Sequence, residues 1–546
     1  MARRILVIGL DGATFDLILP WARERFLPNI DRLMRKGVWG ELQSTIPPIT
    51  GAAWVSFMTG RNPGKTGIYD FMLRKNNDYD LKLINSTSVN NETIWDILRE
   101  NDIRTCVFNF PIYPPYKVKG FFVSGFMAPS TKVEFTWPES LKLELHRLVK
   151  GYEFCPNPLS YSSEKAYLED LYRVTEKQLK VIKYLMNKDW QFFMAYLDGT
   201  DNIQHAMWKY MDDSHLLFDP EKAKKYGNAI LDYWQRIDKF IGELKIPEDT
   251  TLIVMSDHGF GKYDKIFYTN VWLMEKGYLR LKPSSKRSSL KSLMIKRGLT
   301  SDNFASALKK LRIYGFVSKV IPRKLRAFIP SSMLSFSNFK EEIDWASTVA
   351  FALPHTSNFG HIYINLKGRE PQGCIEHGEE YQQIREEIIT ALKGLKHPKT
   401  GEIVKVQVYK PEEIYTGPYV SYAPDIIFFI DDMKASFQTG LHNCAFTEGT
   451  LAPFHNATHR MDGIFIAFGK DIKNGEIIEN AEIIDLAPTF LHILDIPIPR
   501  DMDGKILREI FKEGSEFITK EIIYQEKDEK EEVKKRIRKL KDFGKI

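Results

Sequence analysis

The chain has few cysteines and no long apolar run. Its 546 residues include only Cys106, Cys155, Cys374 and Cys444, and no two of them form a C-x-x-C pair. This usage is typical of a reducing compartment, so it predicts a cytoplasmic location and excludes a C-x-x-C metal site. No apolar stretch approaches the roughly 20 residues that span a membrane, so we expect no transmembrane helix.

The N-terminal stretch MARRILVIGLDG is basic and then apolar, as a signal peptide is. The apolar run is too short for one, Asp11 interrupts it, and no small-residue cleavage site follows. We therefore interpret this stretch as a buried first strand.

Short apolar runs that end in acidic residues or histidine recur along the chain. They are RILVIGLDG, ending at Asp11, WQFFMAYLDGTD, ending at Asp198 and Asp201, TTLIVMSDHGF, with Asp257 and His258, and GIFIAFG, which follows His459. Helical periodicity fills residues 163–188 and 226–244 between them. The alternation predicts an α/β fold, a doubly wound and mostly parallel central sheet flanked by helices, with its ligand site beyond the carboxyl ends of the strands.

We expect four parts along the chain: residues 1–262 as the first part of the core, 263–345 as an inserted basic cap, 346–515 as the second part of the core, and 516–546 as a charged C-terminal helix. The cap prediction rests on residues 280–326, which hold fourteen Lys or Arg against one acid, Asp302. Two interpretations are open: a solvated insertion, or a basic amphipathic surface for anionic lipid or a polyanionic substrate. The segment has few aromatics, so we expect no specific nucleic-acid binding.

A hydroxyl stands where a loop meets a helix in PPITGAAWVSFMTG. Thr50 follows two prolines and precedes an apolar helical run. It is interpreted either as an N-cap, whose oxygen accepts a backbone N–H, or as a nucleophile at a helix N-terminus that attracts an anionic phosphate.

Two short motifs pair carboxylates with imidazoles. In DGTDNIQH, Asp201 and His205 are four residues apart, which places them on one helical face. In SDHG, Asp257 and His258 are adjacent, and the glycine that follows permits a turn in which both reach one ion. A solvated helix face for the first pair and a hydrogen-bonded turn for the second are the other interpretations, but the common placement of both pairs at strand ends predicts metal ligands.

Asp11 at the end of the first strand and His459 in THRMDG complete the set, with His455 as the rival of His459. Mixed Asp and His ligands without cysteine suit zinc, with manganese as the alternative. Two such ions clamp the attacking and the leaving oxygens of a phosphoryl group.

The order GLDG, TGAAW, TGRNPGKTGI, DGTDNIQH, SDHGF and THRMDG resembles the alkaline phosphatase superfamily, and most of all its type I phosphodiesterase and nucleotide pyrophosphatase branch. The resemblance runs through most of the chain, to IIDLAPTFLHILDIPIPRDMDGKIL. It implies one metal ion on Asp11, Thr50, Asp257 and His258, and a second on Asp201, His205 and His459. It also implies that Thr50 is the nucleophile, which forms a phospho-threonine, and that the Gly51 N–H faces the phosphoryl oxygens.

The chain departs from the family pattern after TGRNPGKTGI. Relatives that cleave nucleotide diesters carry an asparagine where Asp70 or Phe71 stands here. Asn62 is our candidate replacement as a substrate-binding donor; a solvated turn is the other interpretation.

The resemblance implies a metal-dependent phosphohydrolase that cleaves phosphodiester or pyrophosphate bonds with two divalent ions. Two alternatives stay open: a phosphomonoesterase or phosphomutase-like enzyme on the same core, and a catalytically degenerate binding protein. The expected partner is a phosphate-ester substrate, lipid-linked or polyanionic if residues 280–326 form a peripheral membrane contact.

Overall fold

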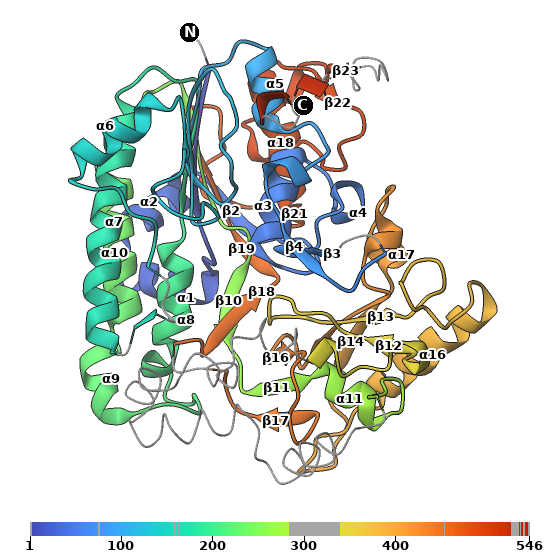
Figure 1. Cartoon of the computed structure of the whole chain (residues 1–546). Coiled ribbons are helices and arrows are strands. Elements are labelled where there is room, and N and C mark those ends of the chain that lie inside the picture. Colours follow the sequence, from blue (N-terminus) through green and yellow to red (C-terminus); the bar gives the residue numbers. More distant parts are fainter. Residues whose placement is uncertain are drawn as a thin grey trace.

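A ten-stranded sheet forms the centre of the larger lobe in the computed structural model (Figure 1). The structure describes residues 3–74, 77–156, 160–161, 163–282, 339–451, 454–525, 534, 537–538 and 541–543. The strands follow one another across the sheet in the order β20 (Glu476–Ile477), β2 (Val38–Gln43), β19 (Asp462–Phe468), β9 (Thr250–Met255), β1 (Arg4–Leu10), β8 (Phe192–Leu197), β5 (Thr105–Phe110), β6 (Gly120–Ser124) and β7 (Thr136–Trp137), and β21 (Ala481–Glu482) also pairs with β2.

The middle of this sheet is parallel, as the apolar runs predict. β1 pairs in parallel with β8 on one side and with β9 on the other, and β8 pairs in parallel with β5. Leu6, Ile8 and Leu10 of β1 pack into one apolar cluster, while Ile5 and Val7 pack into the other. Both faces of the strand are therefore covered, which explains its unbroken apolar sequence.

Helices cover the two faces. On one face lie α1 (Phe15–Arg23), α2 (Pro28–Lys36), α6 (Ser140–Leu148), α7 (Glu164–Met186), α8 (Gly199–Met211), α9 (Pro220–Tyr226) and α10 (Ala229–Glu243); on the other lie α3 (Thr50–Thr59), α5 (Ile94–Glu100) and α18 (Leu486–Ile493). The helices predicted at 163–188 and 226–244 are confirmed as α7 and α10. No helix among the described residues is long and apolar enough to cross a membrane.

The GIFIAFG strand is an exception to the mostly parallel sheet that the sequence predicts. β19 is antiparallel to both of its neighbours, β2 and β9. The chain returns from the smaller lobe at the carboxyl ends of the parallel strands, through β18 (Ala457–Arg460), and therefore enters the sheet in the opposite direction.

A smaller lobe holds two further sheets. One has the order β12 (Ala350–Phe351), β13 (Gly360–Ile364), β15 (Ile426–Ile430), β14 (Val406–Tyr409), and the other β16 (Ala435–Gln438), β11 (Lys265–Tyr268), β17 (Phe446–Glu448). α11 (Thr269–Glu275), α16 (Glu379–Lys393) and α17 (Pro411–Ile414) accompany them. The lobe has its own apolar core, which includes Phe267, Trp272 and Phe428.

This lobe corrects the predicted boundary at residue 346. Residues 350–448 form the small sheets rather than a second part of the large one, because the chain rejoins the large sheet only at β19. Of the basic segment 280–326, residues 283–326 lie outside the described residues, so the cap prediction stays a prediction.

The end of the chain also differs from the predicted helix 516–546. α19 (Glu516–Thr519) is a single turn, and β23 (Tyr524–Gln525) pairs with β22 (Ile498–Pro499). Within the described residues that follow, Phe543 packs on Tyr116 and Asp542 pairs with Arg99. Residues 526–533 lie outside the description.

Candidate active site

Thr50 is the first residue of α3, and the residue at the N-cap is Ile49. Because Ile49 occupies the N-cap position and Thr50 lies inside the helix, the interpretation of Thr50 as an N-cap is wrong. The Thr50 hydroxyl instead lies 3.2 Å from Nε2 of His258. The first turn of α3 is buried, and Ile49 gives its first N–H groups no side-chain cap.

Three oxygen-bearing side chains surround Nε2 of His258. Besides Thr50, Asp11 Oδ1 lies at 3.2 Å and Asp257 Oδ2 at 3.4 Å. Asp11 comes from the end of β1, and Asp257 and His258 follow β9, its parallel neighbour. The carboxyl ends of adjacent parallel strands thus bring these groups together, as the fold class predicts.

A second group forms around Asp201 on α8. Its Oδ2 lies 3.4 Å from Nε2 of His205, one helical turn later, and its Oδ1 lies 3.4 Å from Nε2 of His459 on β18. The rings of His258 and His459 stack with centroids 3.6 Å apart, so the two groups adjoin.

Each of the three histidines is oriented by a backbone carbonyl. Nδ1 lies 2.6 Å from the Ala457 oxygen in His205, 3.0 Å from the Gly259 oxygen in His258, and 3.0 Å from the Pro48 oxygen in His459. A carbonyl accepts only, so Nδ1 carries a proton, and Nε2 is the nitrogen that faces the carboxylates. Two acceptors at such distances need a cation or a proton between them.

The carboxylate oxygens are also short of donors. Asp11 Oδ1, Asp201 Oδ1 and Asp257 Oδ2 are buried and have no hydrogen-bond partner among the described residues. Burial and the neighbouring Asp11 raise the pKa of Asp257 well above its usual range. Burial alone lowers the pKa of His258, but Asp257 and Asp11 outweigh it and raise that pKa to about 10. The same carboxylates that favour a proton on Nε2 of His258 would favour a divalent metal ion in its place.

Two sets of ligand atoms lie within 4.8 Å of one another: Asp11, Asp257 and His258, and Asp201, His258 and His459. The donor set, three carboxylates and imidazole Nε2 atoms without a thiolate, suits divalent metal ions.

Comparison with known proteins agrees with this geometry. Residues 5–455 match the family model of type I phosphodiesterases and nucleotide pyrophosphatases. The chain belongs to this family. It is therefore a phosphodiesterase/nucleotide pyrophosphatase-like hydrolase with an alkaline-phosphatase-like fold.

Among solved structures, murine ectonucleotide pyrophosphatase/phosphodiesterase 5 is similar, with 14% sequence identity and a TM-score of 0.48 over 93% of this chain and 100% of that chain. No curated protein matches the sequence. Among the expected metal ligands, His459 lies just beyond residue 455, where the match to the family model ends.

The geometry separates the two candidate histidines of FHNATHR. His459 reaches Asp201, whereas the ring of His455 stacks on that of His205 at 4.3 Å and its backbone oxygen accepts from Tyr263 at 2.6 Å. His455 thus supports the position of His205.

Asn62 is not brought to the cluster. Its amide caps α4 (Pro63–Thr66) and donates to Thr416 at 3.0 Å and to Asp503 at 2.7 Å. The side chain holds a turn, which is the other interpretation that its sequence context allows.

Sequence reasoning missed two residues beside the ligands. The Tyr196 hydroxyl donates to Asp11, and Asn358 Nδ2 lies 2.9 Å from the Pro48 oxygen and 3.3 Å from Nδ1 of His459. Tyr196 is two residues before Asp198 in the motif, so its place was visible in the sequence. Asn358 lies in the smaller lobe and carries no local signal.

Proposed function

We propose that this hydrolase cleaves phosphodiester or pyrophosphate bonds through a phospho-threonine on Thr50. The observation that carries the proposal is the place of Thr50, at the buried start of α3 and 3.2 Å from the imidazole that Asp11 and Asp257 also face.

Asp11, Thr50, Asp257 and His258 would hold one divalent ion, and Asp201, His205 and His459 the other, with zinc preferred and manganese as the alternative. When bound, such ions lower the pKa of a hydroxyl and neutralise the charge of a phosphate. The orphaned carboxylate oxygens and the orientation of the three Nε2 atoms toward the carboxylates support this assignment.

Thr50 Oγ1 forms a bond to phosphorus as the bond from phosphorus to the leaving alcohol breaks. The hydroxyl proton of Thr50 passes to solvent water, and solvent water supplies the proton that joins the departing alcohol or phosphate. Water then attacks the phosphorus of the phospho-threonine, releases the monoester and restores the hydroxyl. The Gly51 N–H, at the positive end of α3, faces the phosphoryl oxygens.

The test is hydrolysis of bis(p-nitrophenyl) phosphate beside p-nitrophenyl phosphate, with zinc and with manganese. We expect diester preference, and a fall in kcat of at least about a thousandfold in Thr50→Ala, because the nucleophile is gone. Thr269→Ala is the matched control, since Thr269 also begins a buried helix, α11, in the smaller lobe.

Equal losses in both variants would contradict the role of Thr50. Monoester preference would favour the phosphatase alternative, and two bound metals without turnover of either ester would favour the binding-protein alternative. A lipid-linked or polyanionic substrate and the cytoplasmic location stay predictions.

A further inference from the structure

An aromatic ring covers the residue next to the proposed nucleophile. Gly51, the second residue of α3, has no side chain, and a Cβ placed on it would lie 3.0 Å from Cδ1 of Phe71 and 3.3 Å from Cδ1 of Ile84. Ile84 is buried, and its N–H donates to the Phe71 carbonyl at 2.8 Å. The backbone that follows Thr50 therefore has an apolar neighbour, the ring of Phe71.

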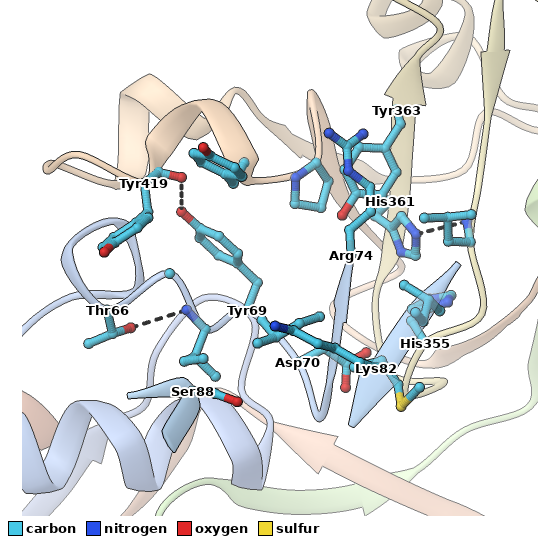
Figure 2. A pocket seen from close by; sticks show the side chains of 18 of the residues that line it. Thr66, Tyr69, Asp70, Arg74, Lys82, Ser88, His355, His361, Tyr363 and Tyr419 are labelled. Carbon is cyan, nitrogen blue, oxygen red and sulfur yellow. Dashed lines mark hydrogen bonds between the residues drawn. The ribbon is translucent and has the colours of Figure 1, made fainter. Parts of the chain in front are cut away.

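Asp70 and Phe71 are adjacent in the sequence, but their side chains serve different places. Asp70 lines a pocket of about 260 Å³ between the two lobes (Figure 2). Other residues that line it are Tyr69, Lys82, His355 and His361. The Asp70 carboxylate accepts from the Thr356 N–H at 2.8 Å and from the Thr356 hydroxyl at 2.6 Å. Phe71 does not line this pocket, and its ring lies against Gly51 instead.

Phe126 adds a second ring beside Phe71. The two rings meet edge to face with their centroids 6.0 Å apart, and Phe126 is 37% exposed while Phe71 is half-buried. Phe126 lies two residues after the end of β6, which is parallel to β5. Because β5, β8 and β1 are parallel as well, Phe126 follows its strand at the same edge of the sheet as Asp11.

The two rings offer apolar contact and no hydrogen-bonding group. A single exposed phenylalanine is ordinary on a protein surface. Phe126 differs because it is joined, through Phe71, to the residue whose N–H is proposed to face the phosphoryl oxygens. An organic group bonded to that phosphorus lies beside these rings, and apolar contact with them removes the area of both from water.

We propose that the aromatic pair, Phe71 and Phe126, binds an uncharged, apolar organic group of the phosphodiester substrate. The inference rests on the proposed function and names the class of one alcohol of the diester. This alcohol is the one that stays on phosphorus while the other leaves. The aromatic pair takes no part in making or breaking bonds, so it selects among substrates through binding.

Two chromogenic diesters with the same leaving group test the aromatic pair: methyl p-nitrophenyl phosphate and n-hexyl p-nitrophenyl phosphate. For the wild type we expect kcat/KM to be about thirtyfold higher for the hexyl ester, which is the effect of burying about two to three methylene groups. The difference should lie mainly in KM, because the group contacts the rings before and during the reaction. In Phe126→Ala, which keeps only the ring of Phe71, the ratio should fall to about three.

Phe26→Ala is the matched control. Phe26 is 40% exposed and lies between α1 and α2, which cover the other face of the sheet from α3. This variant should keep the wild-type ratio. A wild type without preference for the hexyl ester, a Phe126→Ala variant that keeps the full preference, or an equal loss of preference in Phe26→Ala overturns the proposal.

Calorimetric titration of the zinc-loaded protein with methylphosphonate and with n-hexylphosphonate separates the aromatic pair from the proposed function, since neither compound has an ester bond to cleave. We expect hexylphosphonate to bind about thirtyfold more tightly in the wild type and about threefold more tightly in Phe126→Ala. If these differences are found but neither ester is cleaved, the proposed function fails and the aromatic pair is supported. Equal affinities, or no binding of either phosphonate, overturn the proposal.

Discussion

The orientation of single side chains decides what this site can bind. Asn358 Nδ2 donates to the Pro48 carbonyl, which also accepts from Nδ1–H of His459, so Asn358 positions the group that holds this ring with Nε2 toward Asp201. Groups that orient a ligand in this way change metal affinity about 10- to 100-fold when they are removed.

We therefore expect Asn358→Ala to weaken zinc binding about tenfold, the low end of that range because the Pro48 carbonyl still holds the ring. Calorimetric titration of metal-free protein measures it. Asn187→Ala, an exposed asparagine at the end of α7, is the control. If Asn358→Ala and the wild type bind zinc with equal affinity, Asn358 does not help to position the metal ligands.

Asp70 links the pocket to stability through pH. Burial raises its pKa to about 6, against the hydrogen bonds from Thr356 and Phe71 that lower it. Because the folded pKa is above the unfolded one, this group costs stability once the pH passes the unfolded pKa of 3.8, and the full cost, about 3 kcal/mol, is present above pH 6.

Asp70→Asn does not titrate, so its free energy of unfolding minus that of the wild type should rise by about 3 kcal/mol between pH 3 and pH 7. Denaturant unfolding at several pH values gives this difference, and any constant effect of the substitution cancels. A difference that is flat with pH would show that Asp70 has an ordinary pKa.

At the scale of elements, the position of α8 sets the second half of the ligand cluster. Gly199, its first residue, meets α10 so closely that an added Cβ would lie 1.9 Å from the Tyr233 hydroxyl oxygen. A side chain there must push α8, with Asp201 and His205, away from α10.

We expect Gly199→Ala to cost about 1–3 kcal/mol of unfolding free energy, as overpacking does, and to lower zinc affinity as well. Adding Tyr233→Phe removes the closest atom and should restore part of both losses. Thermal unfolding and zinc titration of the single and double variants test this. If the single and the double variant have the same stability and zinc affinity, the added methyl group does not clash with the Tyr233 hydroxyl.

Elements with a local signal were predictable. Apolar runs ending in Asp11, Asp198 and Asp257 predicted β1, β8 and β9, because buried parallel strands need no polar alternation. The direction of β19 was not predictable from GIFIAFG, since an antiparallel strand buried on both faces has the same sequence pattern. Its direction follows from where the smaller lobe returns the chain.

At the scale of the whole molecule, the site joins segments that the sequence separates by hundreds of residues. The Asp and His ligand candidates were predictable because each lies beside a strand or on a helix face of a known motif. Asn358 and His361 were not, since the tertiary packing of the smaller lobe alone brings them to Pro48 and to the pocket.

Because the site brings buried carboxylates together, the stability of the fold depends on the metal ions that the site is proposed to hold. Asp11 and Asp257 are buried near each other, and burial opposes the charge of Asp257, so without a metal ion the fold depends on a proton on His258 to offset these carboxylates. With chelator at pH 7, Asp257→Asn should therefore melt at least as high as the wild type. With zinc at a hundred times its Kd, the wild type should gain about 3 kcal/mol from that ion and melt higher than the variant.

Calorimetric melting in both conditions measures this reversal. Asp249→Asn, just before β9 begins, is a control that should follow the wild type. An Asp257→Asn protein that melts well below the wild type in chelator would mean that the protein's own groups, rather than a metal ion, balance this carboxylate.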